Sequence, residues 1–275
     1  MDYDDGFVAY LNGTEIARRN APATLLYNST ATGDRTIAQA VTPELGEIIG
    51  ESYRIFAPYT IGRTLDVCHC PCCMTEETER VLVATPLREI PSGTLAEYTN
   101  SAHGWDDGEV ARQMRHFLPR YLELIALGEP PCNMGLDICL RRLGSAGWRS
   151  KWPAAEVDIL DRFFDAFLRQ GLADLELTQW PVGWRLASDM ADVLTMAVTA
   201  GAEIGRLLAA WERAEDPGAT LHMAALRDCV SITLRHTRFR SHYLNDHTEA
   251  AEAIGPGEQT IEFLAGVGCA DDHDP

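Results

Sequence analysis

The sequence predicts a mainly α-helical protein, an irregular multi-helix domain preceded by a short β-hairpin-like N-terminal segment. The 275 residues are 46% hydrophobic and 23% charged, which are ordinary values for a globular chain. Between Thr42 and Ile254 apolar residues recur at helical spacing, whereas the segment before them carries a tight-turn signal. We therefore expect an N-terminal fragment over residues 1–41, a helical domain over residues 42–255 and an acidic tail over residues 256–275.

The N-terminal segment has the pattern of two strands joined by a tight turn. Phe7–Leu11 and residues 14–17 are largely apolar runs, and Asn12 and Gly13 separate them. Asn-Gly is favoured in such a place because a type I′ turn requires a positive φ at both central residues. A lone hairpin is marginal in water, so we expect a fragment of a β domain rather than a complete one.

Helix start and stop signals recur along the rest of the chain. Thr42 has the character of an N-cap, Pro43 that of a first helical residue, and Pro58 ends this first helix. A second helix follows Asp107, and Pro119 should kink it. The other helices are expected at residues 153–172, 184–211 with a break at Gly201, and 221–234, and as shorter elements at residues 95–99, 135–143 and 249–254. Alternation of period two is not clear anywhere after Thr42, so we expect no strands there.

The net charge limits the partners. With 23 Lys and Arg against 41 Asp and Glu, the chain carries −18 and repels phosphate backbones and anionic lipid over most of its surface. The most basic stretch, residues 235–240, is interpreted as a solvated helix end. We therefore expect no nucleic-acid partner and no membrane partner, whereas a protein partner with a basic surface suits this charge.

We expect a cytoplasmic, bacterial protein. The first residues have neither the basic nor the apolar region of a signal peptide, and the most apolar stretch, residues 193–211, contains Glu203 and Arg206. Thiols stay reduced in the cytoplasm, so the 8 cysteines are not interpreted as a disulfide scaffold. Lys151 is the only lysine, which together with the many alanines indicates a GC-rich bacterial gene.

The sequence nominates no enzyme. The GxSxG, HExxH, P-loop, GxGxxG and protein-kinase patterns do not occur in it. Catalytic groups can be assembled in space from distant residues, so enzymatic activity is neither predicted nor excluded. We assign no catalytic residue and no cofactor-binding residue other than metal ligands.

One short stretch concentrates the unusual chemistry. Cys68, His69, Cys70, Cys72 and Cys73 are followed by a threonine and three nearby glutamates, which suit the N-cap and first turn of a helix. Thiolates and imidazoles are the ligands that zinc prefers, and the C-x-C and C-x2-C spacings favour chelation. We therefore predict a metal site among these five residues, with a zinc-type ion in a structural role.

The loop alone is not expected to supply all four ligands of one ion. Cys72 and Cys73 are adjacent, so their side chains cannot easily face the same ion. We expect two or three ligands from the loop and one or two from elsewhere. The candidates outside the loop are Cys132, Cys139, His103 and His116.

Two alternatives to the metal site stay open. The run from Cys70 to Cys73 has the C-P-x-C form of glutaredoxin-like proteins, which would make this a thiol oxidoreductase, although no strand of a βαβ unit is expected before it. Free cysteines are also easily buried as small side chains. In that case the protein would be a metal-free helical interaction module.

Two segments resemble known groups of proteins. Residues 56–79, with residues 94–105, resemble a group of uncharacterised helical bacterial proteins that share the Cys-His-Cys-Pro-Cys-Cys box, over about residues 45–254. That resemblance implies the extent of the helical domain and no activity. Residues 3–35 resemble a fragment of jelly-roll, carbohydrate-binding-like β-sandwich modules, and this short resemblance implies no sugar binding.

Overall fold

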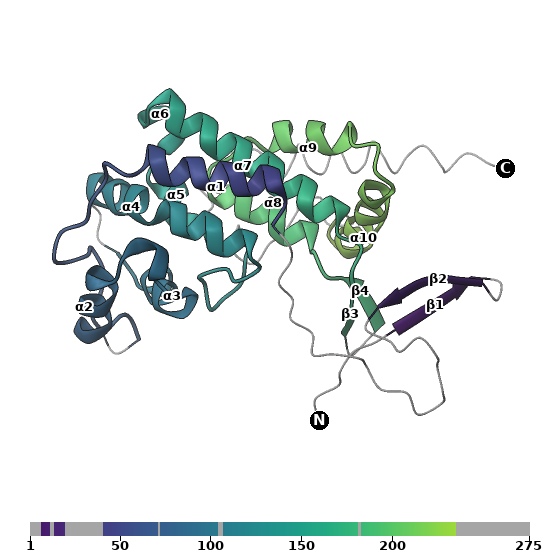
Figure 1. Cartoon of the computed structure of the whole chain (residues 1–275), viewed down its shortest axis with the longest axis horizontal. Coiled ribbons are helices and arrows are strands. Elements are labelled where there is room, and N and C mark those ends of the chain that lie inside the picture. The colour runs from purple at the N-terminus through teal and green to yellow at the C-terminus, as the bar shows by residue number, and fades with distance from the viewer. Residues whose placement is uncertain are drawn as a thin grey trace. The chain divides into compact units, whose positions relative to one another are not determined.

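The computed structural model divides the chain into two compact units, Met1–Gln39 and Ala40–Pro275 (Figure 1). The structure describes residues 7–11, 14–19, 41–70, 72–103, 107–180 and 183–234. The predicted helix at residues 249–254, the basic stretch at residues 235–240 and the acidic tail at residues 256–275 lie outside these ranges.

The first unit contains an antiparallel hairpin of strands β1 (Phe7–Leu11) and β2 (Thr14–Arg19). Phe7 pairs with Arg19 and Leu11 pairs with Thr14, and the register shifts between Ala9 and Tyr10. The hairpin predicted from the Asn-Gly turn signal is therefore confirmed.

The second unit is mainly helical, as predicted. Its first helix, α1, begins where the sequence indicates, because the Thr42 side chain accepts a hydrogen bond from the Leu45 amide at 3.4 Å. The N-cap predicted after the cysteines is also present, since Thr75 accepts from the Thr78 amide at 3.1 Å. The helices are α1 (Pro43–Ile55), α2 (Glu76–Ala84), the 3-10 helix η1 (Leu87–Glu89), α3 (Ser92–Asn100), α4 (Asp107–Ala126), α5 (Arg141–Ser145), α6 (Trp148–Lys151), α7 (Ala154–Ala173), α8 (Met190–Thr199), α9 (Ile204–Glu212) and α10 (Pro217–Leu234).

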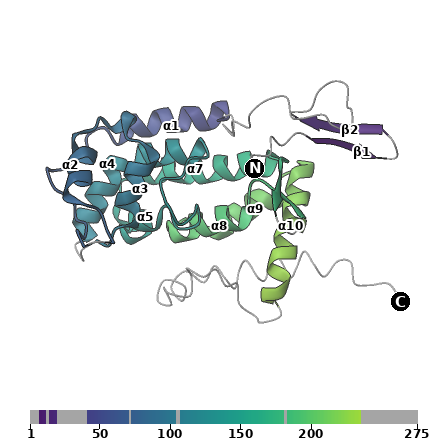
Figure 2. The same cartoon turned by 90° about the horizontal axis from the view of Figure 1, so that it is seen from below.

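Helix α7 forms the centre of this unit. Helices α1, α8, α9 and α10 all pack against it, and α4 packs against both α1 and α5. Most of the apolar residues of this helix are buried, and the rings of Phe163 and Phe167 stack with centroids 5.7 Å apart. Figure 2 shows α2, α3, α4 and α5 gathered at one end of the unit and α10 at the other.

The prediction of a helix over residues 184–211 is wrong at its start. Strands β3 (Leu177–Trp180) and β4 (Gly183–Leu186) form an antiparallel hairpin there, so the expectation of no strands after Thr42 is wrong as well. The helix begins only at Met190, because the Asp189 carboxylate accepts from the Ala191 amide at 2.8 Å. The predicted break at Gly201 is confirmed: its φ of +87° is one that helical residues do not adopt.

A glycine with a positive φ shortens one predicted helix, and a proline lies inside another. The short helix predicted over residues 135–143 is reduced to α5, which begins at Arg141, and Gly135 has a φ of +131° that a helix does not accommodate. Helix α4 continues through Pro119, which lies inside its bounds, and the kink predicted there stays a prediction. Among the described residues, no helix is both long and apolar enough to span a bilayer.

The close approach of α5 to α8 gives a stability test. A Cβ atom at Gly144 would overlap the carbonyl oxygen of Thr199, whereas one at Gly46, on the exposed face of α1, would meet nothing within 4 Å. We expect Gly144→Ala to lower the free energy of unfolding in urea by roughly 1–3 kcal/mol, through overpacking. The matched Gly46→Ala should raise it by about 0.5–1 kcal/mol, because alanine costs less entropy in a helix. Equal effects of the two substitutions would contradict this packing.

Candidate metal centre

The predicted cysteine stretch lies in the connection between α1 and α2, at residues 65–74, which we call the cysteine loop. Apolar side chains anchor both of its ends: Leu65 is 7% exposed and Met74 is fully buried. Among the described residues between these ends the side chains are only partly buried or exposed, and His69 and Cys72 are among the exposed ones. Val67 is partly buried and packs on the hydrophobic core, so the apolar contacts hold the ends and the first part of the loop.

Backbone hydrogen bonds fasten the loop to the C-terminal end of α3. The Cys68 amide donates to the Ala102 carbonyl at 2.7 Å, and the Met74 amide donates to Ser101 Oγ at 2.7 Å. The Ser101 hydroxyl in turn donates to the carbonyl of Glu97 at 2.8 Å. The chain immediately after α3 is thus tied to both ends of the cysteine-bearing segment.

Glu79, a buried carboxylate on α2, makes a second attachment. One of its oxygens accepts a hydrogen bond from the Leu65 amide, and the other lies 2.8 Å from Nε2 of His69. A buried carboxylate is costly unless it is hydrogen-bonded, and these two partners satisfy it. Glu79 therefore holds the start of the loop and orients the His69 ring.

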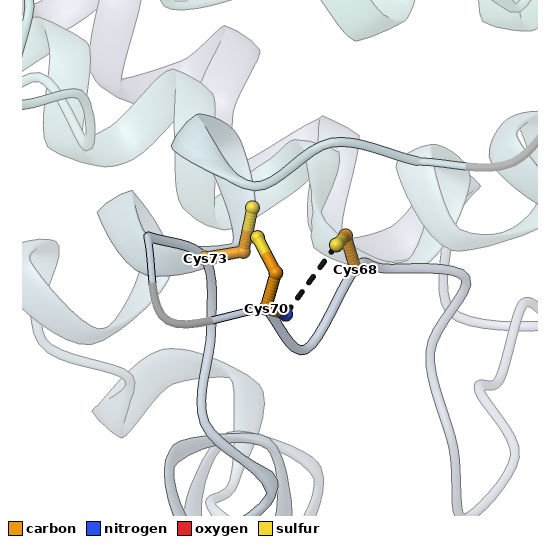
Figure 3. Close-up of side chains that lie close together, drawn as sticks. All are labelled: Cys68, Cys70 and Cys73. Carbon is orange, nitrogen blue, oxygen red and sulfur yellow. Dashed lines mark hydrogen bonds between the residues drawn. The ribbon is translucent and has the colours of Figure 1, made fainter.

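Three thiols converge at the centre of the loop. The Sγ atoms of Cys68, Cys70 and Cys73 all lie within 4.8 Å of one another (Figure 3). The Cys73 amide donates to the Cys70 carbonyl at 2.9 Å, which closes a turn, and the Cys70 amide donates to Cys68 Sγ at 3.4 Å. Throughout the described ranges this is the only group of three or more Cys, His, Asp or Glu ligand atoms that meets this spacing. The group could hold a metal ion.

The structure brings three of the five predicted ligands into this group. Cys72 stands beside it, exposed, with its Sγ 3.1 Å from that of Cys70. His69 also stands outside it, with its Nε2 atom bonded to Glu79.

The candidate ligands from elsewhere in the chain are also outside the group of three. His116 Nδ1 is 3.0 Å from the Tyr59 carbonyl, and the Cys132 thiol donates to Asn100 Oδ1 at 3.4 Å. Cys139 is only 2% exposed, within the hydrophobic core. His103 also stands outside the group, and its backbone directly follows Ala102, whose carbonyl accepts the hydrogen bond from the Cys68 amide.

The pKa values of the thiols are unequal. Hydrogen bonds from the Cys72 side chain and amide, and from the Cys68 and Cys73 thiols, lower the pKa of Cys70 to about 6. The same contact, together with the charge of the Cys70 thiolate, raises the pKa of Cys72 to about 11. At neutral pH the metal-free cluster therefore carries a thiolate at Cys70, and thiolates are the form of cysteine that binds metals.

Several residues that position the loop carry no visible signal in the sequence. Arg142, on α5, is 1% exposed and donates through Nη2 to the carbonyls of Tyr98 at 2.6 Å and Ser101 at 2.5 Å. Its guanidinium also lies 4.2 Å from the centroid of the Tyr98 ring. Glu79 was expected only as a first-turn acid on α2. The contacts of Glu79 with the cysteine loop, and the hydrogen bond that Ser101 accepts from Met74, join segments that are far apart in the sequence. No local pattern predicts them.

Comparisons with protein-family models, with curated proteins and with solved structures gave no match. The resemblances noted for residues 45–254 and residues 3–35 stay predictions. The class of site therefore follows from its geometry: it is a cluster of thiols on a helical scaffold that could hold a metal ion.

The attachment through Glu79 can be tested with a matched pair on α2. Glu79→Ala should lower the free energy of unfolding by about 1–3 kcal/mol, because it leaves the buried Leu65 amide without its acceptor. Glu77→Ala removes an exposed carboxylate that pairs only with Arg80, and should change stability by less than about 0.5 kcal/mol. Hydrogen exchange should speed up over residues 65–74 in the first variant alone. Unchanged exchange there would show that Glu79 does not hold the loop.

The inequality of the thiol pKa values predicts a pH profile for alkylation of the metal-free protein. Labelling of Cys70 by iodoacetamide should rise with a midpoint near pH 6, and Cys72→Ala should move this midpoint upward by removing the largest stabilising hydrogen bond. Cys132 is an internal reference, since burial raises its pKa. Peptide mapping by mass spectrometry measures each site. A common midpoint for Cys70 and Cys132 would contradict the lowered pKa of Cys70.

Proposed function

We propose that the protein binds one zinc-type ion through Cys68, Cys70 and Cys73, and that the ion has a structural role in holding the cysteine loop on the helical unit. The observation that supports this most directly is the mutual separation of the three Sγ atoms, all within 4.8 Å. Zinc lies about 2.3 Å from a thiolate sulfur, so two sulfurs on one tetrahedral ion are about 3.8 Å apart. The cluster thus needs only small adjustments to surround an ion.

The chemistry of the ligands favours a soft or borderline metal. Thiolates select zinc, copper(I) and iron–sulfur centres over magnesium or calcium, and tetrahedral sulfur-rich sites are typical of structural zinc. The loop also offers chelation at short range, since Cys70 and Cys73 face each other across a closed turn. Zinc is therefore the proposed occupant.

The weak attachment of the Cys70–Cys73 turn supports a structural role for the ion. Among the described residues from Cys68 to Cys73 no side chain is fully buried, and Cys70 and Cys73 are linked to each other through one backbone hydrogen bond. An ion bound to all three thiolates would connect this turn to Cys68, which is itself bonded to the chain after α3. Metal binding would then contribute directly to folding stability.

Elemental mass spectrometry on the full chain tests the proposal. Protein purified without a histidine tag under reducing conditions should contain about one zinc per chain. Cys68→Ser, Cys70→Ser and Cys73→Ser should each lose most of it, whereas Cys132→Ser, which alters a thiol bound to Asn100, should retain it. No metal in the wild type, even after zinc is supplied during expression, would overturn the proposal and favour a metal-free interaction module.

The structural role makes a separate prediction about stability. A strong chelator should lower the melting temperature of the wild type, because the ion binds the folded state and not the unfolded chain. In Cys73→Ser the melting temperature should already be lower, and the chelator should cause little further change. Differential scanning calorimetry measures both. A wild type that holds zinc but melts at the same temperature with and without chelator would rule out a structural role.

Thiol redox chemistry is a second candidate, supported by the 3.1 Å separation of the Cys70 and Cys72 sulfurs. Oxidation would join them in a disulfide, with two protons and two electrons passing to an acceptor such as hydrogen peroxide, which becomes two waters. Peptide mapping after peroxide treatment of the metal-free protein should then find Cys70 linked to Cys72. Cysteines that stay unlinked while peroxide oxidises methionine would count against this candidate.

A further inference from the structure

The cysteine loop contains a fourth thiol that stands beside the cluster of three. Cys72 is exposed and outside the group, yet its Sγ atom lies 3.1 Å from that of Cys70. We propose that Cys72 makes the metal site sensitive to peroxide: oxidation joins Cys70 to Cys72 in a disulfide, which removes one metal ligand and releases the ion. This inference rests on the proposed metal binding and adds a regulation of the same site.

The separation of the two sulfurs is the first argument. At 3.1 Å it is shorter than the roughly 3.8 Å between two sulfurs on one tetrahedral zinc, and longer than the about 2.05 Å of a disulfide bond. A shift of about 1 Å at the two side chains therefore brings them to bonding distance. Cys72 is thus placed to react with Cys70 rather than to share its ion.

The accessibility of the loop is the second argument. Cys72 is exposed and Cys70 is only partly buried, so a molecule as small as hydrogen peroxide can approach this pair of sulfurs from solvent. Cys139, by contrast, is 2% exposed within the hydrophobic core. Exposed disulfides are the labile and regulatory ones, because thiol reductants reach them. A bond between Cys70 and Cys72 should therefore be reversible.

The first step is the oxidation of Cys70 by peroxide. The Cys70 thiolate attacks one oxygen of hydrogen peroxide, an S–O bond forms and the O–O bond breaks. The second oxygen leaves as hydroxide and takes up a proton from solvent to become water. Cys70 is now a sulfenic acid, and it has lost the two electrons that peroxide has gained.

The second step is the attack of Cys72 on the oxidised Cys70. An S–S bond forms and the S–O bond breaks, and the leaving hydroxide takes the Cys72 proton to become a second water. The pKa of Cys72 is raised chiefly by its hydrogen bond with Cys70 and by the charge of the Cys70 thiolate, and the first step removes that charge. Over both steps two thiols become one disulfide and one peroxide becomes two waters.

The disulfide leaves the ion with fewer ligands. Thiolates bind metals and disulfide sulfurs carry no such charge, so only Cys68 and Cys73 of the group of three remain. The turn closed by the Cys73 amide and the Cys70 carbonyl then loses its connection to Cys68 through the ion. Oxidation should therefore release the ion and loosen the cysteine loop.

Zinc release by peroxide, followed with a chromogenic chelator on the full chain loaded with zinc, tests the inference. The wild type should hold about one zinc per chain, release it with peroxide and bind it again after a thiol reductant and fresh zinc are supplied. Cys72→Ser should hold zinc as well as the wild type. Excess peroxide should then convert its Cys70 to the irreversible sulfinic acid, so the reductant should restore little binding. Cys132→Ser, at a partly buried thiol outside the loop, is the matched control and should behave as the wild type.

Differential alkylation locates the disulfide. Thiols that remain free after peroxide treatment are blocked with one reagent, the disulfide is reduced, and its two thiols are labelled with a second reagent. Fragment ions in mass spectrometry assign each label, and the second label should appear on Cys70 and Cys72 of the wild type. Circular dichroism verifies the helical fold of each variant.

The outcomes separate this inference from the proposed function. A wild type that binds no zinc would overturn both. Zinc that stays bound while peroxide oxidises methionine would overturn the inference and leave the three-cysteine site in place. A second label on Cys73 in place of Cys72, with full recovery in Cys72→Ser, would also overturn it. Loss of zinc binding in Cys72→Ser before any peroxide is added would make Cys72 a ligand and would contradict the inference as well.

Discussion

The buried guanidinium of Arg142 holds the C-terminal end of helix α3, and the position of the candidate site depends on that end. It is 1% exposed and donates to the carbonyls of Tyr98 and Ser101, at the last turn of α3, while it stacks on the Tyr98 ring. The hydrogen bonds of Nη2 and the cation–π contact offset part of the desolvation cost of this cation, while Nε and Nη1 are buried without a hydrogen-bond partner in the structure. Because Ser101 and Ala102 in turn accept from the two ends of the cysteine-bearing segment, the position of α3 determines the position of the thiols.

The cysteine loop combines strong constraints at its ends with a weak one at its centre. Leu65 and Met74 are buried and Glu79 holds the first half, yet the Cys70–Cys73 turn is closed by a single backbone bond. A thiolate-bound ion would strengthen this weakly held turn, because metal binding contributes to folding stability. The low pKa of Cys70 acts in the same direction, because a thiol that is already ionised gives up no proton when it binds a metal.

Local patterns in the sequence predicted the helices well and the site in part. Thr42 and Thr75 are N-caps in the structure as predicted, because a cap depends on residues only a few positions apart. The hairpin of β3 and β4 was missed, since its four-residue strands are too short for a clear alternation. The convergence of Cys68 and Cys70 with Cys73 follows from spacing, whereas the contribution of Ser101 and Arg142 depends on long-range packing that spacing does not encode.

X-ray absorption at the zinc edge, on full-length protein loaded with one equivalent of zinc, tests the central claim most directly. Three sulfur atoms at about 2.3 Å are expected if the thiol cluster of Cys68, Cys70 and Cys73 encloses the ion. A first shell of oxygen and nitrogen without sulfur would contradict the account, because it would place the metal somewhere other than the cysteine loop.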